Sequence, residues 1–341
     1  MNDKKASKNK DLNVHAGPDD AALDLTLRPA NWDDFVGQAN IKKSLQVILR
    51  AAKQRKEAAD HLLFSGPAGL GKTTLAYLTA RELGSQVKVT SGPALERTGD
   101  LAAILTNLEP RDVLFIDEAH RINRMIEEVL YPAMESYKLH LVVGKGPSAR
   151  ALMIDLPPFT LIAATTRENL LSQPLRSRFG ATFRLTYYHD HDIEKILARS
   201  AKILGTAIAA EAVSILAAAA RATPRVANRL LRRARDYAEV HRQGAIDVPA
   251  AREALELLEI DARGLEPHDR RLLETIIDKF GGGPVGLNTL AAALNEDEDV
   301  IAEVYEPFLM SLGFLQRKPG GRVALAPAYE HLGKKQPGTL L

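Results

Sequence analysis

The string GPAGLGKT, residues 66–73, decides the fold of this chain. It follows the short apolar run His61–Phe64 and opens a segment, about Lys72–Leu83, whose pattern predicts a helix ending at Gly84. In such a strand–turn–helix the glycines turn backbone N–H groups toward phosphate oxygens, and the positive end of the helix faces the same point. Lys72 then reaches the outer phosphates, and the Thr73 hydroxyl is placed to bind Mg²⁺. The loop glycines are Gly66, Gly69 and Gly71.

A second motif, DVLFIDEAH, occupies residues 112–120. Asp117 and Glu118 follow a predicted buried strand, Val113–Ile116, and ligands bind at the carboxyl ends of strands in open parallel sheets. We expect Asp117 to hold Mg²⁺ through water and Glu118 to orient or deprotonate the attacking water. A solvated acidic turn is the common alternative, but the upstream phosphate loop argues against it. The letters DEAH also mark another helicase class, which the spacing and the downstream sequence disfavour.

Two threonines, Thr165 and Thr166, end the next predicted strand, Phe159–Ala164. A hydroxyl at this position is suited to hydrogen-bond the γ-phosphate or the attacking water. A threonine that closes a strand only through its β-propensity explains the same letters equally well.

Two strings carry candidate arginines. LRSRFG, residues 175–180, contains Arg176 and Arg178, and an arginine supplied by a neighbouring subunit accelerates phosphoryl transfer by roughly 10³–10⁵-fold. TPRVANRLLRR, residues 223–233, begins a predicted helix whose first turn would let Arg225 reach a nucleotide held between domains. Ordinary surface arginines would give the same local patterns.

Composition sets the class of protein. The chain has 341 residues and a hydrophobic content of 45%, which excludes wholesale disorder. Its 45 basic and 43 acidic residues leave a net charge of +2, so any site for a polyanion must be built locally. There is no cysteine, which excludes disulfides and thiolate metal sites. The first residues lack an apolar signal core, and the longest apolar stretch is too short to span a bilayer. We therefore expect a cytoplasmic protein without a membrane segment.

The pattern along the chain predicts an α/β fold followed by helical modules. Residues 1–24 are polar and are expected to form a flexible tail. Short apolar runs alternate with amphipathic segments over 25–188, which is typical of a parallel sheet covered on both faces, with a β-hairpin near 140–156. Residues 189–260 predict a small helical domain, and 262–341 have the outline of a winged helix. Helices are expected near 41–59, 127–136, 269–280, 287–294 and 300–312, and a C-terminal hairpin at 314–317 and 322–325.

Together these motifs resemble the AAA+ ATPases, and longer strings narrow the resemblance to the RuvB family, bacterial motors that drive Holliday-junction branch migration. The resemblance runs from about Leu25 to His331 and includes the C-terminal module. The strings that carry it include LRPANWDDFVGQ, HLLFSGPAGLGKTTLA, EEVLYPAME, LPPFTLIAATTR, PLRSRFG, TPRVANRLLRRARD and DKFGGGPVGLNTLAAAL.

The resemblance implies ATP and Mg²⁺ as cofactors and assigns the nucleotide site. Arg178 resembles the finger that reaches a neighbour's ATP, and Arg225 resembles the sensor of the small domain. The residues implied to lie at the nucleotide are Leu27, Arg28, Gly69, Lys72, Thr73, Thr74, Glu135, Ser136, Tyr137, Tyr188 and Arg225.

The resemblance also implies the partners. These are double-stranded DNA at four-way junctions, the junction-binding protein RuvA through the hairpin near 140–156, the resolvase RuvC in the same complex, and further copies in a ring, a hexamer. Arg317 and Arg322 are implied to contact DNA from the wing. Gly320 and Glu298 replace residues that are often basic in relatives, and residues 262–341 hold 9 basic against 11 acidic residues, which weakens the expected DNA contact.

Two other functions fit part of the sequence. A clamp-loader-like AAA+ remodeller of a protein partner would keep the ATPase but would not need the winged helix or the hairpin. A nucleotide-gated binding module that hydrolyses little would not need Glu118.

Overall fold

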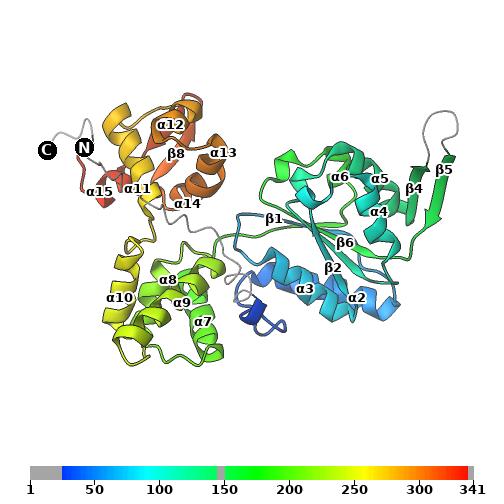
Figure 1. Cartoon of the computed structure of the whole chain (residues 1–341), viewed down its shortest axis with the longest axis horizontal. Helices are drawn as coiled ribbons and strands as arrows, with labels where there is room; N and C mark the ends of the chain where they lie inside the picture. Colours follow the sequence, from blue (N-terminus) through cyan, green and yellow to red (C-terminus); the bar gives the residue numbers. More distant parts are fainter. Residues whose placement is uncertain (1–24, 144–149, 337–341) are drawn as a thin grey trace, which may run out of the picture.

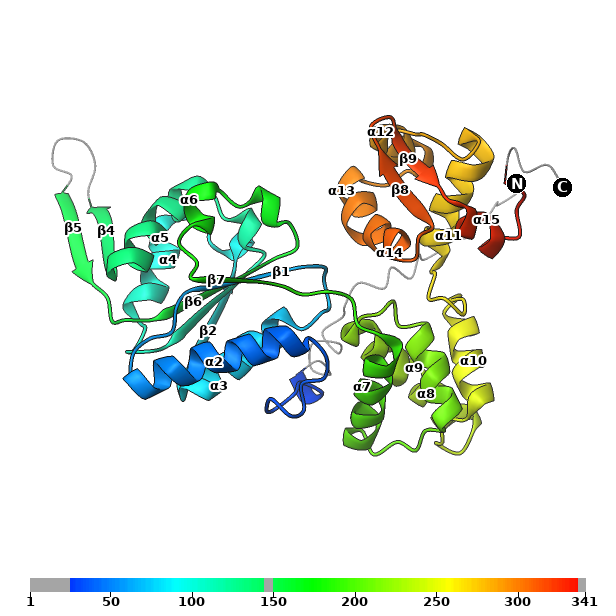
Figure 2. The same ribbon diagram turned by 180° about the vertical axis from the view of Figure 1, so that it is seen from behind.

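The computed structural model describes residues 25–143 and 150–336, and it arranges them as a sheet-containing unit, a group of lid helices and a C-terminal unit (Figure 1). The lid helices and the C-terminal unit lie together on one side of the sheet-containing unit, as the reverse view confirms (Figure 2). The predicted tail, residues 1–24, lies outside the described residues.

A five-stranded parallel sheet with strand order β2-β3-β6-β1-β7 forms the first unit, which confirms the predicted α/β class. Its central strands β1, β3 and β6 are almost wholly buried, because neighbours and helices cover them on both faces. All five strands point the same way, so Ser65, Asp117 and Thr165 end at one edge of the sheet. The strands are β1 (Leu62–Ser65), β2 (Val87–Ser91), β3 (Val113–Asp117), β6 (Thr160–Thr165) and β7 (Ala181–Arg184).

Side chains that alternate along each strand feed two separate hydrophobic layers. Phe64 and Phe115 face α2 (Ala39–Arg55) and α3 (Lys72–Leu83), and this layer continues into the lid helices. Leu63 faces α4 (Thr98–Thr106) and α5 (Arg124–Ser136) on the other side. The two layers fix the sheet in place between helices, and the site therefore forms on a rigid frame.

A two-stranded antiparallel sheet, β4 (Lys138–Val143) with β5 (Arg150–Asp155), projects from this unit (Figure 1). It corresponds to the hairpin expected near 140–156, although its first strand begins two residues earlier than expected. Leu152 and Met153 are exposed on it. The tip, residues 144–149, lies outside the described residues.

Four lid helices follow: α7 (Asp190–Ile203), α8 (Ala210–Ala218), α9 (Pro224–His241) and α10 (Val248–Leu257). The side chain of Thr223 caps α9 by accepting a hydrogen bond from the N–H of Val226, and Pro224 occupies the first turn as the sequence predicts. The cap fixes the start of α9 and with it the position of Arg225 in the first turn of the helix.

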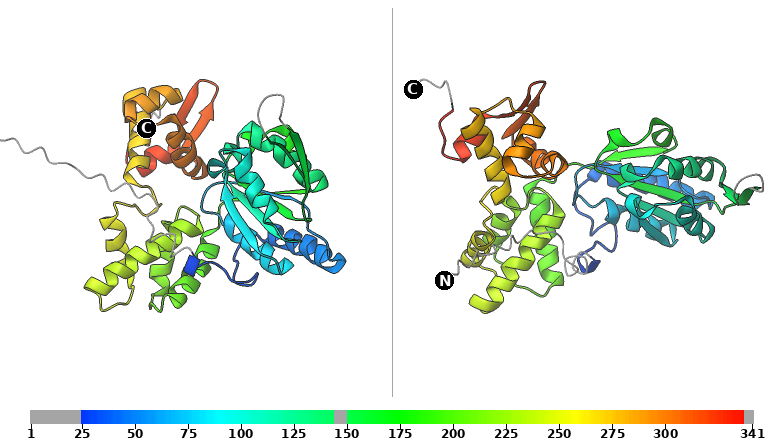
Figure 3. Two further views of the ribbon diagram at one scale, coloured as in Figure 1. Left: turned by 45° about the vertical axis from the view of Figure 1, so that its right-hand side comes forward. Right: turned by 45° about the horizontal axis from the view of Figure 1, so that its top comes forward.

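The C-terminal unit has its own core and the order of a winged helix. Two of its helices contain a π-helical turn, where a single regular helix was expected. The elements are α11 (Pro267–Glu274) with the turn Thr275–Lys279, α12 (Leu287–Leu294), α13 (Glu298–Val300) with the turn Ile301–Tyr305, α14 (Glu306–Ser311), β8 (Leu315–Lys318), β9 (Gly321–Ala324) and α15 (Ala326–His331). The hairpin β8–β9 stands free of the lid helices in both further views (Figure 3).

Among the described residues, none of the helices combines the length and the apolar character that crossing a bilayer requires.

Candidate nucleotide site

The loop between β1 and α3 has the backbone that phosphate binding needs. Gly66, Gly69 and Gly71 have φ angles of 133°, 78° and 98°, in the region that L side chains rarely adopt. A Cβ atom added to Gly66 would lie 2.5 Å from the carbonyl oxygen of Leu185. Glycine is therefore required here for both conformation and space. The helix begins at Lys72 and ends before Gly84, whose φ of 67° confirms the predicted left-handed cap.

A cavity of about 520 Å³ opens above this loop, between the sheet edge, the N-terminal segment and the lid helices. It brings together twelve of the residues that the sequence analysis assigned to the nucleotide or to catalysis. They are Leu27, Arg28, Gly69, Gly71, Lys72, Thr73, Thr74, Asp117, Glu118, Thr166, Tyr188 and Arg225.

Other residues that the sequence patterns did not indicate also line the cavity. Phe35 lines it from the N-terminal segment, and Arg199 and Asn228 line it from lid helices α7 and α9. Arg199 donates a hydrogen bond to the carbonyl oxygen of Leu27 at 3.0 Å, which fastens the N-terminal segment to the lid. A polar residue within an ordinary amphipathic helix carries no local signal for this position.

Lys72 is buried, with 8% of its surface exposed, and its Nζ donates hydrogen bonds to the carbonyl oxygens of Gly66 and Pro67 at 2.8 and 2.7 Å. The pKa of Lys72 is lowered to about 8. Burial is the main cause and the charge of Arg225 acts in the same direction, while Asp117 opposes them. The charge of this lysine therefore depends on pH within the range of ordinary assays.

We expect ATP affinity to fall as the pH rises through 8, because the empty site then loses the Lys72 charge that the phosphates favour. Above that pKa, binding must take up a proton, and affinity should drop by up to about tenfold per pH unit. Calorimetry at roughly pH 9 in two buffers of different ionisation enthalpy measures this proton uptake. Lys72→Arg is the control, because a guanidinium stays charged throughout this range. Equal apparent enthalpies in the two buffers would contradict the shifted lysine.

The two carboxylates stand at the junction between β3, which ends at Asp117, and the turn that Glu118 begins. Asp117 accepts a hydrogen bond from the N–H of Glu118 at 2.9 Å, and Glu118 itself has a left-handed φ of 47°. A residue other than glycine in this conformation is strained, and such strain is concentrated at functional sites. Arg121 pairs with the Glu118 carboxylate at 3.1 Å. Asp117 and Glu118 nevertheless both line the cavity, where the sequence placed a magnesium ligand and a residue that orients water.

Of the two threonines at the end of β6, Thr166 lines the cavity and Thr165 does not. Thr165 is buried, and its Oγ1 accepts the N–H of Arg167 at 2.9 Å and lies 3.0 Å from Nδ1 of His120. Thr165 therefore joins the turn after β3 to the end of β6, while Thr166 is the candidate contact to the nucleotide.

Arg178 and Glu135 lie together, outside the cavity. The guanidinium of Arg178 pairs with Glu135 at 2.7 Å, donates to the carbonyl oxygen of Pro174 at 2.6 Å, and lies 4.4 Å from the centre of the Tyr131 ring. Ser136 and Tyr137 follow directly and do not line the cavity either. None of these residues therefore lines the nucleotide cavity of its own chain.

The two wing arginines share one carboxylate. Arg317 and Arg322 each donate from Nε to Glu306 at 2.6 Å, and Glu306 is fully buried. The side chain of Arg317 is 49% exposed, whereas that of Arg322 is 16% exposed. Both arginines neutralise Glu306, and Arg317 is the more accessible of the two from solvent.

A P-loop ATPase of the AAA+ class is defined by this combination of features: a parallel sheet, a glycine-rich phosphate loop and a lid of helices beside that loop. Three family models match the chain in succession: the Holliday junction DNA helicase RuvB P-loop domain at 27–185, the RuvB AAA lid domain at 188–261 and the RuvB C-terminal winged helix domain at 262–333. The chain belongs to the RuvB family. It is a nucleotide-binding ATP hydrolase of that family.

Individual relatives match this chain over nearly its full length. The Holliday junction branch migration complex subunit RuvB of Chloroflexus aggregans is 58% identical over 94% of this chain and 92% of its own, and that of Myxococcus xanthus is 54% identical over 98% and 97%. The solved structure of the Thermotoga maritima RuvB Holliday junction branch migration motor is 47% identical, covers 92% of this chain and all of its own, and superimposes with a TM-score of 0.84.

Proposed function

We propose that this chain is an ATP-driven double-stranded DNA translocase that powers branch migration of Holliday junctions in recombination and DNA repair. It acts as a ring, a hexamer, in which neighbouring chains share each ATP site. The observation that carries the shared site is the position of Arg178, which is held by Glu135 and lies outside its own cavity. The winged helix and the names of the relatives support DNA junctions as the substrate.

The chemistry of the site follows from its residues. Lys72, the loop N–H groups and the amino end of α3 bind the phosphates. Glu118 orients the attacking water, Thr166 contacts the γ-phosphate or that water, and Arg178 of the adjacent chain stabilises charge on the transferred group. Arg225 and Tyr188 close the cavity from the lid side.

A magnesium ion fits the oxygen atoms available in the cavity. The Thr73 hydroxyl and the Asp117 carboxylate both line it, and Mg²⁺ uses one or two such protein ligands together with phosphate oxygens and water. The ion supplies neutralisation of phosphate charge. The described residues form no separate cluster of three or more histidine or acidic side chains that would hold another metal.

The partners are proposed from the surface and from the family. The hairpin β4–β5 projects with the apolar side chains of Leu152 and Met153 exposed, which suits it as the docking element for RuvA, and RuvC joins the same complex. We place the chain in the cytoplasm and draw its domains at 25–188, 189–260 and 262–341. The winged helix and the hairpin have no role in a clamp-loader-like remodeller, and Glu118 in the cavity has none in a module that does not hydrolyse ATP.

A synthetic four-way junction tests the function. With ATP, Mg²⁺ and RuvA, the chain should convert the junction to duplex products. Without ATP, the chain and RuvA together should convert it no faster than RuvA alone. The ATPase rate per chain should rise with protein concentration as rings assemble. Hydrolysis at full rate by a monomer, or a junction left unmoved while ATP is consumed, would contradict the proposal.

Arg317→Gln should weaken duplex binding and lower the slope of log affinity against log salt by about 0.9, the value for one lost phosphate contact. The DNA-free ATPase should not change, because no residue of β8 or β9 lines the nucleotide cavity. Arg322→Gln is the matched comparison. Both variants remove a partner of the buried Glu306, but Arg322 is the more buried arginine and contacts both oxygens of that carboxylate, so Arg322→Gln should lower the melting temperature more than Arg317→Gln does. An unchanged salt slope for Arg317→Gln would place the DNA contact elsewhere.

A further inference from the structure

The segment 221–225, which joins the end of the α8–α9 loop to the first two residues of α9, lies directly against the phosphate loop. A Cβ atom added to Gly69 would lie 3.1 Å from Cβ of Arg225 and 3.6 Å from Cβ of Thr223. The same segment accepts a hydrogen bond from the N–H of Tyr188 at the carbonyl oxygen of Ala222, at 2.9 Å. The lid therefore meets the phosphate loop at this segment.

The other end of the segment holds the C-terminal unit. Arg221 makes a two-point contact with Asp269 of α11, at 2.5 and 3.3 Å, and its guanidinium lies 4.3 Å from the centre of the Phe308 ring of α14. Asp269 is fully buried and also accepts the N–H of Glu266, as the cap of α11. A buried, bidentate pair of this kind fixes orientation as well as distance.

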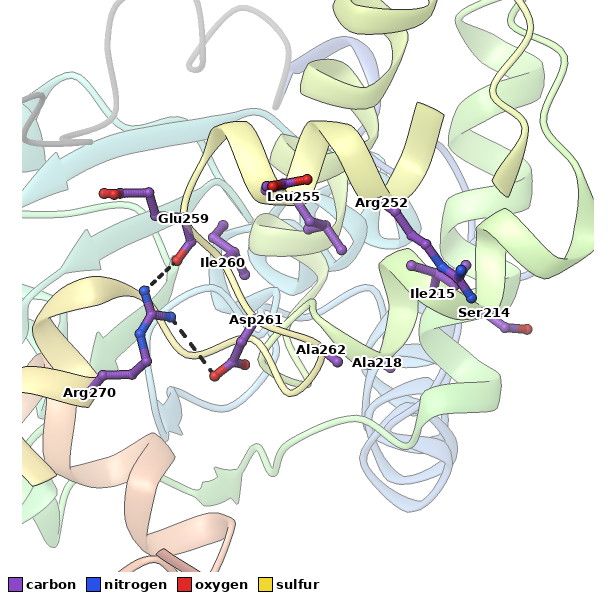
Figure 4. A pocket seen from close by; sticks show the side chains of 11 residues that line it. Ser214, Ile215, Ala218, Arg252, Leu255, Glu259, Ile260, Asp261, Ala262 and Arg270 are labelled. Carbon is purple, nitrogen blue, oxygen red and sulfur yellow. Dashed lines mark hydrogen bonds and ion pairs between the residues drawn. The ribbon is translucent and has the colours of Figure 1, made fainter. Parts of the chain in front are cut away.

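Further contacts hold the lid helices to the C-terminal unit around this pair. Arg229 pairs with Glu266 at 2.7 Å. A second cavity lies between α8, α10 and the residues that follow α10, and Arg270 of α11 lines it. There Arg270 donates a hydrogen bond to the carbonyl oxygen of Glu259 at 2.8 Å and faces Asp261 (Figure 4). Gly264 approaches the lid so closely that an added Cβ would lie 2.6 Å from the carbonyl oxygen of Ala219.

The contact between the C-terminal unit and the sheet-containing unit is of a different kind. Arg167, just after β6, pairs with Asp299 and Glu303, and Asp299 is 82% exposed. Exposed pairs contribute little and exchange readily, whereas a buried pair is costly to break. The C-terminal unit thus makes a buried pair with the lid at Asp269, whereas its pairs with the sheet-containing unit are exposed at Asp299 and partly exposed at Glu303.

We propose that Arg221 is the positioning residue that couples nucleotide state to the DNA-binding unit, because the five-residue segment 221–225 contacts the phosphate loop at Arg225 and pairs with Asp269 at Arg221. The lid and the winged helix move as one body about the sheet. This inference rests on the proposed DNA-motor function. Arg221 does not line the nucleotide cavity, so its role is in transmission and not in hydrolysis.

The test measures base pairs migrated per ATP hydrolysed on a four-way junction with RuvA. Arg221→Gln and Asp269→Asn should each lower this ratio by about fivefold or more, the usual scale of a coupling between sites. The DNA-free ATPase should stay within about twofold of the wild type. Arg221→Lys, which keeps the charge but loses the two-point geometry, should give an intermediate ratio. Arg242→Gln, which breaks an exposed pair with Glu253 on the same lid, is the matched control and should leave the ratio unchanged.

A second measurement is independent of DNA and guards against misfolded variants. The chain contains no cysteine, so labels at Lys88→Cys on β2 and Glu330→Cys on α15, both exposed, report the distance between the sheet and the C-terminal unit. ATP should change this distance in the otherwise wild-type chain and change it little in Arg221→Gln with an unchanged melting curve. A normal ratio and a normal distance change in Arg221→Gln would overturn the coupling role. A wild-type chain that never moves the junction would instead overturn the motor function.

Discussion

Replacing Arg178 by alanine is expected to leave ATP binding intact and to reduce turnover by roughly 10³–10⁵-fold, the range for an arginine supplied in trans. Binding should persist because Arg178 does not line the cavity of its own chain. Turnover should fall because the charge that develops on the transferred phosphoryl group loses its partner. Titration with a fluorescent ATP analogue and a steady-state ATPase assay measure the two effects separately.

A mixing experiment makes this result specific to a shared site. Arg178→Ala chains lack the finger, and Lys72→Ala chains lack the phosphate lysine, so neither should hydrolyse ATP alone. In random mixed rings about a quarter of the interfaces combine an intact Lys72 with an intact Arg178. The mixture should therefore recover activity. A mixture that stays inactive, although its rings form, would place Arg178 and Lys72 in the same site of one chain.

Glu118→Gln is expected to reduce hydrolysis by about 10²–10⁴-fold, the usual contribution of a positioned general base. The amide keeps the size of the side chain and binds ATP without activating water. Rings should then accumulate in the ATP-bound state, which size-exclusion chromatography with bound-nucleotide analysis detects. Glu57→Gln is a useful comparison, because this exposed carboxylate pairs with Arg55 and does not line the cavity. Hydrolysis at the wild-type rate by Glu118→Gln would remove the residue from the mechanism.

The parts of the fold that the sequence predicted best are those fixed by local chemistry. Helix α3 has the expected limits, because glycines with positive φ stand at both of its ends. The outer strands β2 and β7 were not predicted, because each is only half buried and lacks the apolar run of a central strand. The helix expected at 41–59 ends earlier, at Arg55, where Lys56 takes a left-handed conformation.

The same distinction holds for the site. The phosphate loop and the carboxylates after β3 are contiguous motifs, so spacing alone located them. Arg199 and Asn228 reach the cavity only because the lid folds over it. Nothing near Arg317 in the sequence indicates its pairing with Glu306, which stands eleven residues earlier. Contacts of this kind depend on packing between elements, and a linear pattern does not contain that information.

The shared carboxylate beneath the wing has a consequence for a machine that must grip and release DNA repeatedly. An arginine that is free in solvent gives up rotational freedom each time it meets a phosphate, at about 0.5–1.5 kcal/mol per side chain. Glu306 already restrains Arg317 and Arg322 before any duplex arrives. If the wing binds phosphates as proposed, each new contact costs less side-chain entropy and the carboxylate weakens the attraction, so we expect the wing both to bind and to release DNA rapidly.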